Sequence, residues 1–180
     1  MELQVAVALI HSETKLESSG TLPKINLGCP NFCDGYVCVD KYPQDPKVIK
    51  ADVYEYLSKA VVQGKKFDTI YSKNLLEHLG DPLQFLILCR SALKSGGVLK
   101  LITDNAEFFP YYMPFALIGT GLGGHSTNSY ALGMNHSVHL VLFTKLHLKN
   151  LFSSAGFDTV SVRRLPKVLF ARLEAQGKLL

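Results

Sequence analysis

Tryptophan and long hydrophobic runs are both missing from this sequence of 180 residues. The longest apolar stretches, residues 5–10 and 138–143, are far too short to cross a bilayer. Neither sign of charge dominates, because 19 lysines and arginines stand against 15 aspartates and glutamates, a formal net charge of +4. This mild basic excess permits an anionic partner but does not require one. The N-terminal sequence lacks the basic start of a signal peptide, and we therefore expect a cytoplasmic protein without a membrane partner.

Cysteine is scarce, with four in the chain, and three of them lie close together: Cys29, Cys33 and Cys38. Their spacing differs from the two-residue separation of zinc knuckles, and no second pair follows at the usual distance. A Cys29–Cys33 disulfide stays open as an alternative, although a reducing cytosol disfavours it. The sequence therefore predicts small buried thiols and no metal site.

A glycine-rich phosphate loop is also absent. Residues 24–27 are typical of a short buried strand that runs into Gly28, and residues 36–39 of a second strand that ends at Asp40. No second glycine occurs before Gly35, so the G-x-G-x-x-G pattern of dinucleotide enzymes is missing. The connection, about eleven residues, is too short for a crossover helix on whose N-terminus a pyrophosphate could sit. These absences favour a cofactor without phosphate, such as S-adenosylmethionine, and leave a nucleotide-sugar or dinucleotide enzyme as the weaker alternative.

Strands and helices alternate along the rest of the chain. Further strands are predicted at residues 48–53, 67–71, 98–102 and 159–163, with a segment at 168–173 that could pair with the last of them. Capping residues predict helices from 54 to 62, from Asp81-Pro82 to Gly96-Gly97, and from Thr144 to Gly156. This order predicts an α/β fold with a mainly parallel sheet covered on both faces. Ligands bind such sheets beyond the carboxyl ends of the strands, where the sequence places Gly28, Asp40, Asp52, residues 72–74 and Asp104-Asn105.

Two acidic residues at these strand ends suit an adenosyl group. Asp40 can accept two hydrogen bonds from a ribose diol, or it can serve a turn beside Lys41. Asp52 can accept a hydrogen bond from an adenine amine and can also cap the helix that follows it. The two roles of Asp52 are compatible.

Seven motifs, in a fixed order, carry a resemblance to a known family. They are INLGCP at 25–30, GYVCVD at 35–40, ADV at 51–53, FDTIYSKNLLEHL at 67–79, LKSGGVLKLITDN at 93–105, HLVLFT at 139–144 and AGF at 155–157. Over residues 24–165 the chain resembles the class I S-adenosylmethionine-dependent methyltransferases, in particular a type 11-like subgroup with a short first loop. The resemblance implies a single domain over residues 1–180, folded as a Rossmann-like three-layer sandwich with an antiparallel C-terminal edge strand. Residues 1–23 are then an N-terminal extension and residues 104–143 an insertion at the acceptor site.

The resemblance also implies an activity, S-adenosylmethionine-dependent methyl transfer, and a set of cofactor contacts. These contacts fall on Asn26, Gly28, Cys29, Asp40, Lys41, Asp52, Val53, Ser72 and Lys73. Pro30 departs from the family pattern, since it stands where a second glycine is usual and removes a backbone N–H. A non-catalytic scaffold or partner subunit with the same fold is therefore the alternative to an enzyme.

The residues that act on the methyl acceptor are expected in the segment 104–143. A general base is needed only if the acceptor loses its proton during transfer, and no metal is required. Our candidates for catalysis are His136, in a polar cluster with its two neighbours, and Asp104, with His125 and His139 as alternative histidines.

The acceptor itself stays open among small molecules, sugars, proteins and RNA. The Asn-Pro-Pro-Tyr type of signature of amino-directed nucleic-acid enzymes is missing after the fourth strand, which weighs against adenine or cytosine amines. A homodimer is a further hypothesis, suggested by the mean hydropathy of +0.14 and by the apolar run at residues 5–10.

Overall fold

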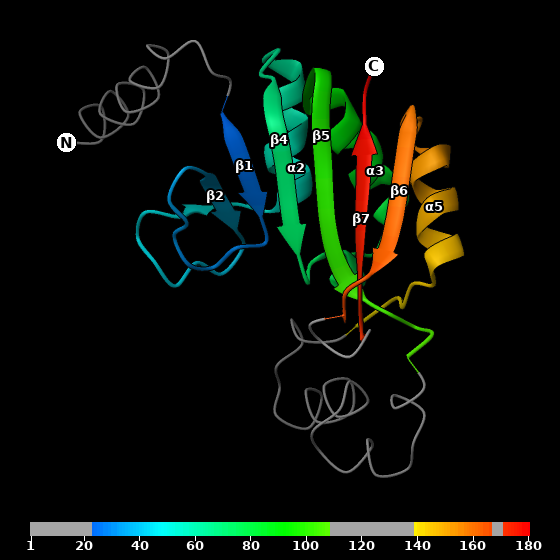
Figure 1. The fold of residues 1–180 in the computed structure, drawn as a ribbon. Coiled ribbons are helices and arrows are strands. Elements are labelled where there is room, and N and C mark those ends of the chain that lie inside the picture. The colour runs from blue at the N-terminus through cyan, green and yellow to red at the C-terminus, as the bar shows by residue number, and fades with distance from the viewer. Residues whose placement is uncertain (1–22, 109–138, 167–170) are drawn as a thin grey trace, which may run out of the picture.

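A seven-stranded sheet organises the molecule, whose computed structural model describes residues 23–108, 139–166 and 171–180 (Figure 1). The strand order is β3-β2-β1-β4-β5-β7-β6, and pairing is parallel from β3 to β5 and antiparallel on both sides of β7. The strands are β1 (Lys24–Leu27), β2 (Val37–Asp40), β3 (Ile49–Lys50), β4 (Phe67–Lys73), β5 (Leu93–Asp104), β6 (Thr159–Arg164) and β7 (Arg172–Lys178). The helices are α2 (Val53–Val62), α3 (Pro82–Ala92), α5 (Lys145–Ser154) and the short 3-10 helix η2 (Leu76–His78).

The three α-helices lie side by side on one face of the sheet, with α3 in contact with both α2 and α5 (Figure 1). The strand register explains which face they cover. One row of paired residues runs across the sheet and turns its mainly apolar side chains toward the helices: Val39, Leu27, Ser72, Leu101, Ala175 and Val162. The helices bury apolar residues against this face, the largest being Leu57, Phe85, Leu86, Leu148 and Phe152. None of the described helices is long and apolar enough to cross a membrane.

The opposite face of the sheet is polar. The neighbouring row of paired residues alternates to that side, as strand geometry requires, and consists of Cys38, Asn26, Tyr71, Lys100, Gln176 and Ser161. Within the described residues no helix covers this second face. The described part of the chain thus supplies the sheet and one helical layer of the predicted sandwich.

Local capping signals predicted the helix starts correctly. A side-chain oxygen of Asp52, Asp81 and Thr144 accepts a hydrogen bond from a backbone N–H in the first turn of α2, α3 and α5, respectively. Pro82 occupies the first turn of α3, and Gly156, with a φ of 84°, follows the end of α5. These three helices are therefore confirmed.

Two predicted boundaries are corrected. Helix α3 ends at Ala92 rather than at Gly96-Gly97, because Leu93 already pairs with Phe67 and begins β5. The antiparallel C-terminal strand is confirmed, but β7 lies between β5 and β6, so that β6 forms the edge of the sheet. Strand β7 also begins four residues later than the predicted segment 168–173.

Gly177→Ala tests how closely α5 and the segment after it pack on β7. A Cβ atom at residue 177 would stand 2.6 Å from Cδ1 of Phe152 and 2.6 Å from Cδ1 of Phe157. Overpacking of this kind costs about 1–3 kcal/mol, so we expect the free energy of unfolding, measured by urea denaturation, to fall by that amount. Gly80→Ala is the control, because a Cβ atom there meets nothing within 4 Å. Equal stability of the two variants would contradict this packing.

Candidate functional site

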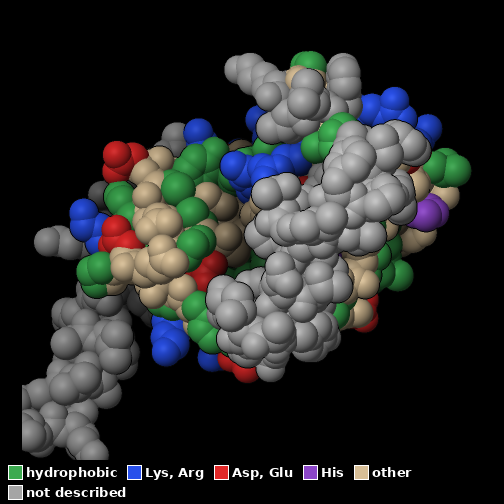
Figure 2. Space-filling view, turned by 90° about the horizontal axis from the view of Figure 1, so that it is seen from below, with side chains coloured by type: hydrophobic (Ala, Val, Ile, Leu, Met, Phe, Trp, Pro, Cys, Tyr) green, Lys and Arg blue, Asp and Glu red, His purple; other side chains and the backbone are tan. Residues whose placement is uncertain are grey.

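Strands β1, β2, β4 and β5 all have their carboxyl ends on the same side of the sheet, at its lower edge in Figure 1. Figure 2 views the molecule from below, toward this edge, and shows acidic and basic side chains intermixed over the part that the described residues form. The residues that follow these strand ends are therefore neighbours in space, whatever their separation in sequence. The predicted site residues Gly28, Asp40 and Asp104 all lie here.

Gly28 and Asp40 join the ends of β1 and β2. Gly28 has a φ of 71°, and its N–H donates to the carbonyl oxygen of Val39 at 2.9 Å. Asp40 is half-buried, and its Oδ1 accepts a hydrogen bond from the N–H of Tyr42 at 2.7 Å. Its Oδ2 has no hydrogen-bond partner among the described residues, so the carboxylate can still accept a hydrogen bond from a ribose hydroxyl.

The space beside Gly28 holds a side chain of the protein. A Cβ atom at residue 28 would lie 3.0 Å from both Cβ and Cδ1 of Leu75. The glycine is thus needed for the close approach of Leu75, as well as for the left-handed backbone. Contact between Gly28 and a cofactor, together with the contacts predicted for Asn26 and Cys29, stays a prediction.

Asp52 and Lys41 form a pair at the start of α2. Oδ1 of Asp52 accepts from the N–H of Tyr54 at 3.0 Å, while Oδ2 lies 3.5 Å from Nζ of Lys41. Val53 is buried as the first residue of the helix. The capping role of Asp52 is confirmed, and its contact with adenine stays a prediction along with those of Lys41 and Val53.

Ser72 and Lys73 differ in their surroundings. Ser72 is 1% exposed, and its hydroxyl donates to the carbonyl oxygen of Leu27 at 3.0 Å, which ties β4 to β1. Lys73, the last residue of β4, is exposed. Of the two predicted cofactor contacts, Ser72 therefore positions the strand end, while Lys73 is accessible to a ligand.

A polar cluster follows the ends of β4 and β5. Oδ2 of Asp104, which is 4% exposed, lies 3.5 Å from Nδ1 of His139, and its Oδ1 lies 3.8 Å from Nε of Arg172. The ring of His139 also meets the ring of His78 edge-on, with centroids 4.7 Å apart. The structure thus brings the predicted residue Asp104 together with His139, one of the alternative histidines, whereas His136 lies outside the described residues.

Glu77 is a further member of this cluster and was not among the predicted site residues. It is fully buried, and its Oε2 accepts a hydrogen bond from the hydroxyl of Thr103 at 2.7 Å. Burial raises the pKa of Glu77 to about 7, against an ordinary value of 4.5. Its backbone carbonyl accepts from the N–H groups of Leu140 and Val141, which holds residues 139–141 against η2. The Glu77-His78 pair of the fourth motif, residues 67–79, was the available signal, but the burial of this glutamate cannot be read from one sequence.

Two groups of side chains in the described residues are close enough to share a metal ion. Glu77, His78 and His139 form one, and Cys29, Cys33 and Cys38 form the other; within each, the ligand atoms lie within 4.8 Å of one another. Burial and the neighbouring Cys33 raise the pKa of Cys29 to about 12. The spacing of the three cysteines does not match a zinc knuckle. They meet because the connection after β1 brings Cys29 and Cys33 next to Cys38 of β2.

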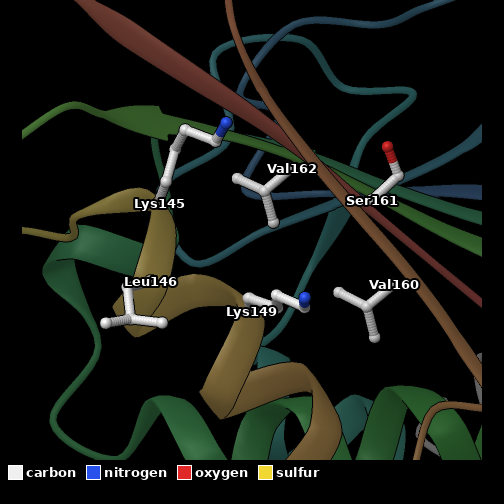
Figure 3. Close-up of a pocket in the computed structure, with 6 residues that line it drawn as sticks. All are labelled: Lys145, Leu146, Lys149, Val160, Ser161 and Val162. Carbon is white, nitrogen blue, oxygen red and sulfur yellow. The ribbon is translucent and has the colours of Figure 1, made fainter.

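A surface groove of about 480 Å³ lies at the end of the strand order that is far from β1 (Figure 3). It is formed between α5 and the edge strand β6 and lined by Lys145, Leu146, Lys149, Val160, Ser161 and Val162. Three strands separate β6 from β1. This groove is therefore distinct from the edge at which Asp40 and Gly28 lie.

Glu77→Gln tests the burial of this carboxyl group through the pH dependence of stability. Because the pKa is raised on folding, the wild type is fully stabilised below pH 4.5 and loses stability as the pH rises to about 7. A glutamine keeps the shape but cannot ionise. We therefore expect the stability of the variant relative to the wild type to increase by about 3 kcal/mol across this range, measured by urea denaturation with a chelator present. The exposed Glu55→Gln serves as control. If the difference in free energy of unfolding between Glu77→Gln and the wild type did not change with pH, the burial of Glu77 would be contradicted.

A family model described as a methyltransferase domain matches residues 25–162. Among curated relatives, the ubiquinone biosynthesis O-methyltransferase of Dinoroseobacter shibae is 34% identical over 59 residues, and that of Histophilus somni is 42% identical over 57 residues. These matches cover 33% and 31% of this chain and 23% and 24% of the relatives. The match thus spans about a quarter of the length of the relatives.

Solved structures share the fold of the chain. A SAM dependent methyltransferase from Archaeoglobus fulgidus has a TM-score of 0.59 at 16% identity, covering 99% of this chain and 94% of that chain. An O-methyltransferase family protein from Burkholderia thailandensis has a TM-score of 0.58 at 12% identity, covering 97% and 56%. The Rossmann-like fold predicted from the sequence is confirmed by this likeness. With a methyltransferase domain model matching most of its length, the chain belongs to the class I S-adenosylmethionine-dependent methyltransferases.

Proposed function

We propose that this chain binds S-adenosylmethionine at the ends of β1, β2 and β3 and transfers its methyl group to a hydroxyl oxygen of a small-molecule acceptor. The observation that carries the proposal is the pairing of Asp104 with His139 beyond β5, two strands away from β1. An acceptor at the ends of β4 and β5 would lie next to a cofactor at β1. The four cysteines are free thiols, which suits the cytoplasmic location that we include in the proposal.

The cofactor end of the site fits an adenosyl group rather than a pyrophosphate. The connection from β1 to β2 contains no helix, so a phosphate would lack a helix N-terminus there. Asp40 keeps one carboxylate oxygen for a ribose hydroxyl, and Asp52 stands at the start of α2 beside it. S-adenosylmethionine, when bound, supplies a methyl group activated by its sulfonium sulfur.

The acceptor end of the site suits a group that must lose a proton. A hydroxyl oxygen is a poor nucleophile until its proton leaves, and a histidine can accept that proton. Asp104 faces Nδ1 of His139 and would hold the ring so that Nε2 takes the proton, as an orienting carboxylate does in other acid–base pairs. Arg172 beside Asp104 offsets its charge. The O-methyltransferase names of the curated relatives support an oxygen acceptor.

Asp40→Asn tests the cofactor site. The substitution removes the charge that strengthens a hydrogen bond to the ribose, so we expect affinity for S-adenosylhomocysteine, measured by titration calorimetry, to fall about tenfold or more. Asp34→Asn makes the same chemical change at an exposed position of the same connection and should bind like the wild type. If the two variants bound S-adenosylhomocysteine with equal affinity, Asp40 would not be a cofactor contact.

His139→Ala tests the proposed base. We expect the rate of methyl transfer from labelled S-adenosylmethionine to a panel of phenols and catechols to fall about a hundredfold, with the affinity for S-adenosylhomocysteine unchanged. Asp104→Asn should lower the rate in the same way, because it removes the group that orients His139. The exposed His147→Ala is the control and should retain full activity. Full activity of His139→Ala would refute its role as base.

A scaffold without activity is the second candidate, favoured by Leu75 beside Gly28 and by Pro30 in the cofactor loop. A wild type that is folded but does not bind S-adenosylhomocysteine would support this function in place of catalysis.

A further inference from the structure

We infer that Cys29, Cys33 and Cys38 bind a zinc ion where the connection between β1 and β2 meets β2. The three sulfur atoms lie within 4.8 Å of one another, and Sγ of Cys29 is 3.3 Å from Sγ of Cys33. Two of the ligands come from the connection, and the third is a buried residue of β2. The sequence analysis predicted no metal here, and this inference replaces that prediction.

The chemistry of the three groups suits zinc better than a hard cation. Zinc takes cysteine thiolates in a tetrahedral arrangement, and three protein ligands leave a fourth position for water or another ligand. Magnesium and calcium require oxygen ligands instead. The fourth position is open to solvent or to the carbonyl oxygen of Asn31, which lies 2.9 Å from Sγ of Cys29 and 3.8 Å from Sγ of Cys33.

Two hydrogen-bond donors face the sulfur atoms. The backbone N–H of Cys33 donates to Sγ of Cys38 at 3.3 Å, and Nδ2 of Asn26 donates to Sγ of Cys33 at 3.7 Å. Donors that bond to metal ligands orient them and stabilise their negative charge. These two donors suit thiolate ligands of a cation, while the thiols now face the carbonyl oxygens of Asn31, Cys33 and Tyr36 at 2.9 to 3.9 Å.

A metal ion would also stabilise this connection. Residues 28–36 link two parallel strands with no helix to pack against the core. Cys38 and Asn26 lie in the row that faces the polar side of the sheet, away from α2 and α3. A zinc ion there would fix residues 29–33 over β2 and so hold the adjoining Gly28 in place. This inference does not depend on the proposed methyl transfer.

The test uses the full chain, purified in reductant, loaded with zinc and freed of excess metal. We expect about one zinc ion per chain by elemental analysis, and in the cobalt-substituted protein an intense thiolate-to-cobalt charge-transfer band. Cys33→Ser should lose the zinc ion and the band. Cys89→Ala removes the remaining thiol, which is buried on α3, and should keep both.

The competing results are distinct. A folded wild type that retains no zinc would overturn the inference, as would zinc retained by Cys33→Ser but lost by Glu77→Gln, which would place the ion at the histidine cluster. A Cys29–Cys33 disulfide that forms despite added zinc, detected by mass spectrometry, would also overturn it. If Cys33→Ser does not fold, the charge-transfer band of the wild type decides, because only thiolate ligation produces it. Binding of S-adenosylhomocysteine is measured separately, so failure of one proposal does not affect the other.

Discussion

Parallel pairing is the constraint on which the rest of this structure depends. Strands that run in the same direction must all end at one edge, so β1, β2, β4 and β5 deliver their following residues to the same place. Asp40 and Asp104 are 64 positions apart in the sequence and yet belong to one edge. Each connection between parallel strands must then return the chain from the carboxyl end of one strand to the start of the next. Helices α2 and α3 do so after β3 and β4, whereas residues 28–36 do so without a helix.

The two faces of the sheet are stabilised in different ways. Apolar residues on one face bury the core beneath α2, α3 and α5, and this burial drives folding. The polar face offers no comparable apolar layer, so a segment that crosses it needs specific interactions instead. The helix-free connection after β1 lies at this face, with the Tyr36 ring near that of Tyr71. The convergence of the cysteines in the same connection is consistent with that need, since metal ligation can replace a missing core in a short segment.

Prediction from sequence succeeded where the signal was local. The N-caps Asp52, Asp81 and Thr144 each start a confirmed helix, because a capping side chain bonds within its own turn. The end of α3 and the insertion of β7 between β5 and β6 depend on distant pairing partners, and a one-dimensional pattern does not contain them. The ordered motifs supplied the family. They did not show which histidine lies beside Asp104, because that depends on the path of residues 105–144.

Glu77 explains how His139 comes to be there. Its backbone carbonyl receives the N–H groups of Leu140 and Val141, while its side chain accepts from Thr103 of β5. One residue of η2 thereby connects the end of β4, the end of β5 and the segment that leads to α5. Asp104 lies beside Arg172 and His139, and the carboxylate of Glu77 accepts a hydrogen bond from the hydroxyl of Thr103. The burial that raises the pKa of Glu77 follows from its position between these elements, whereas the hydrogen bond from Thr103 lowers that pKa.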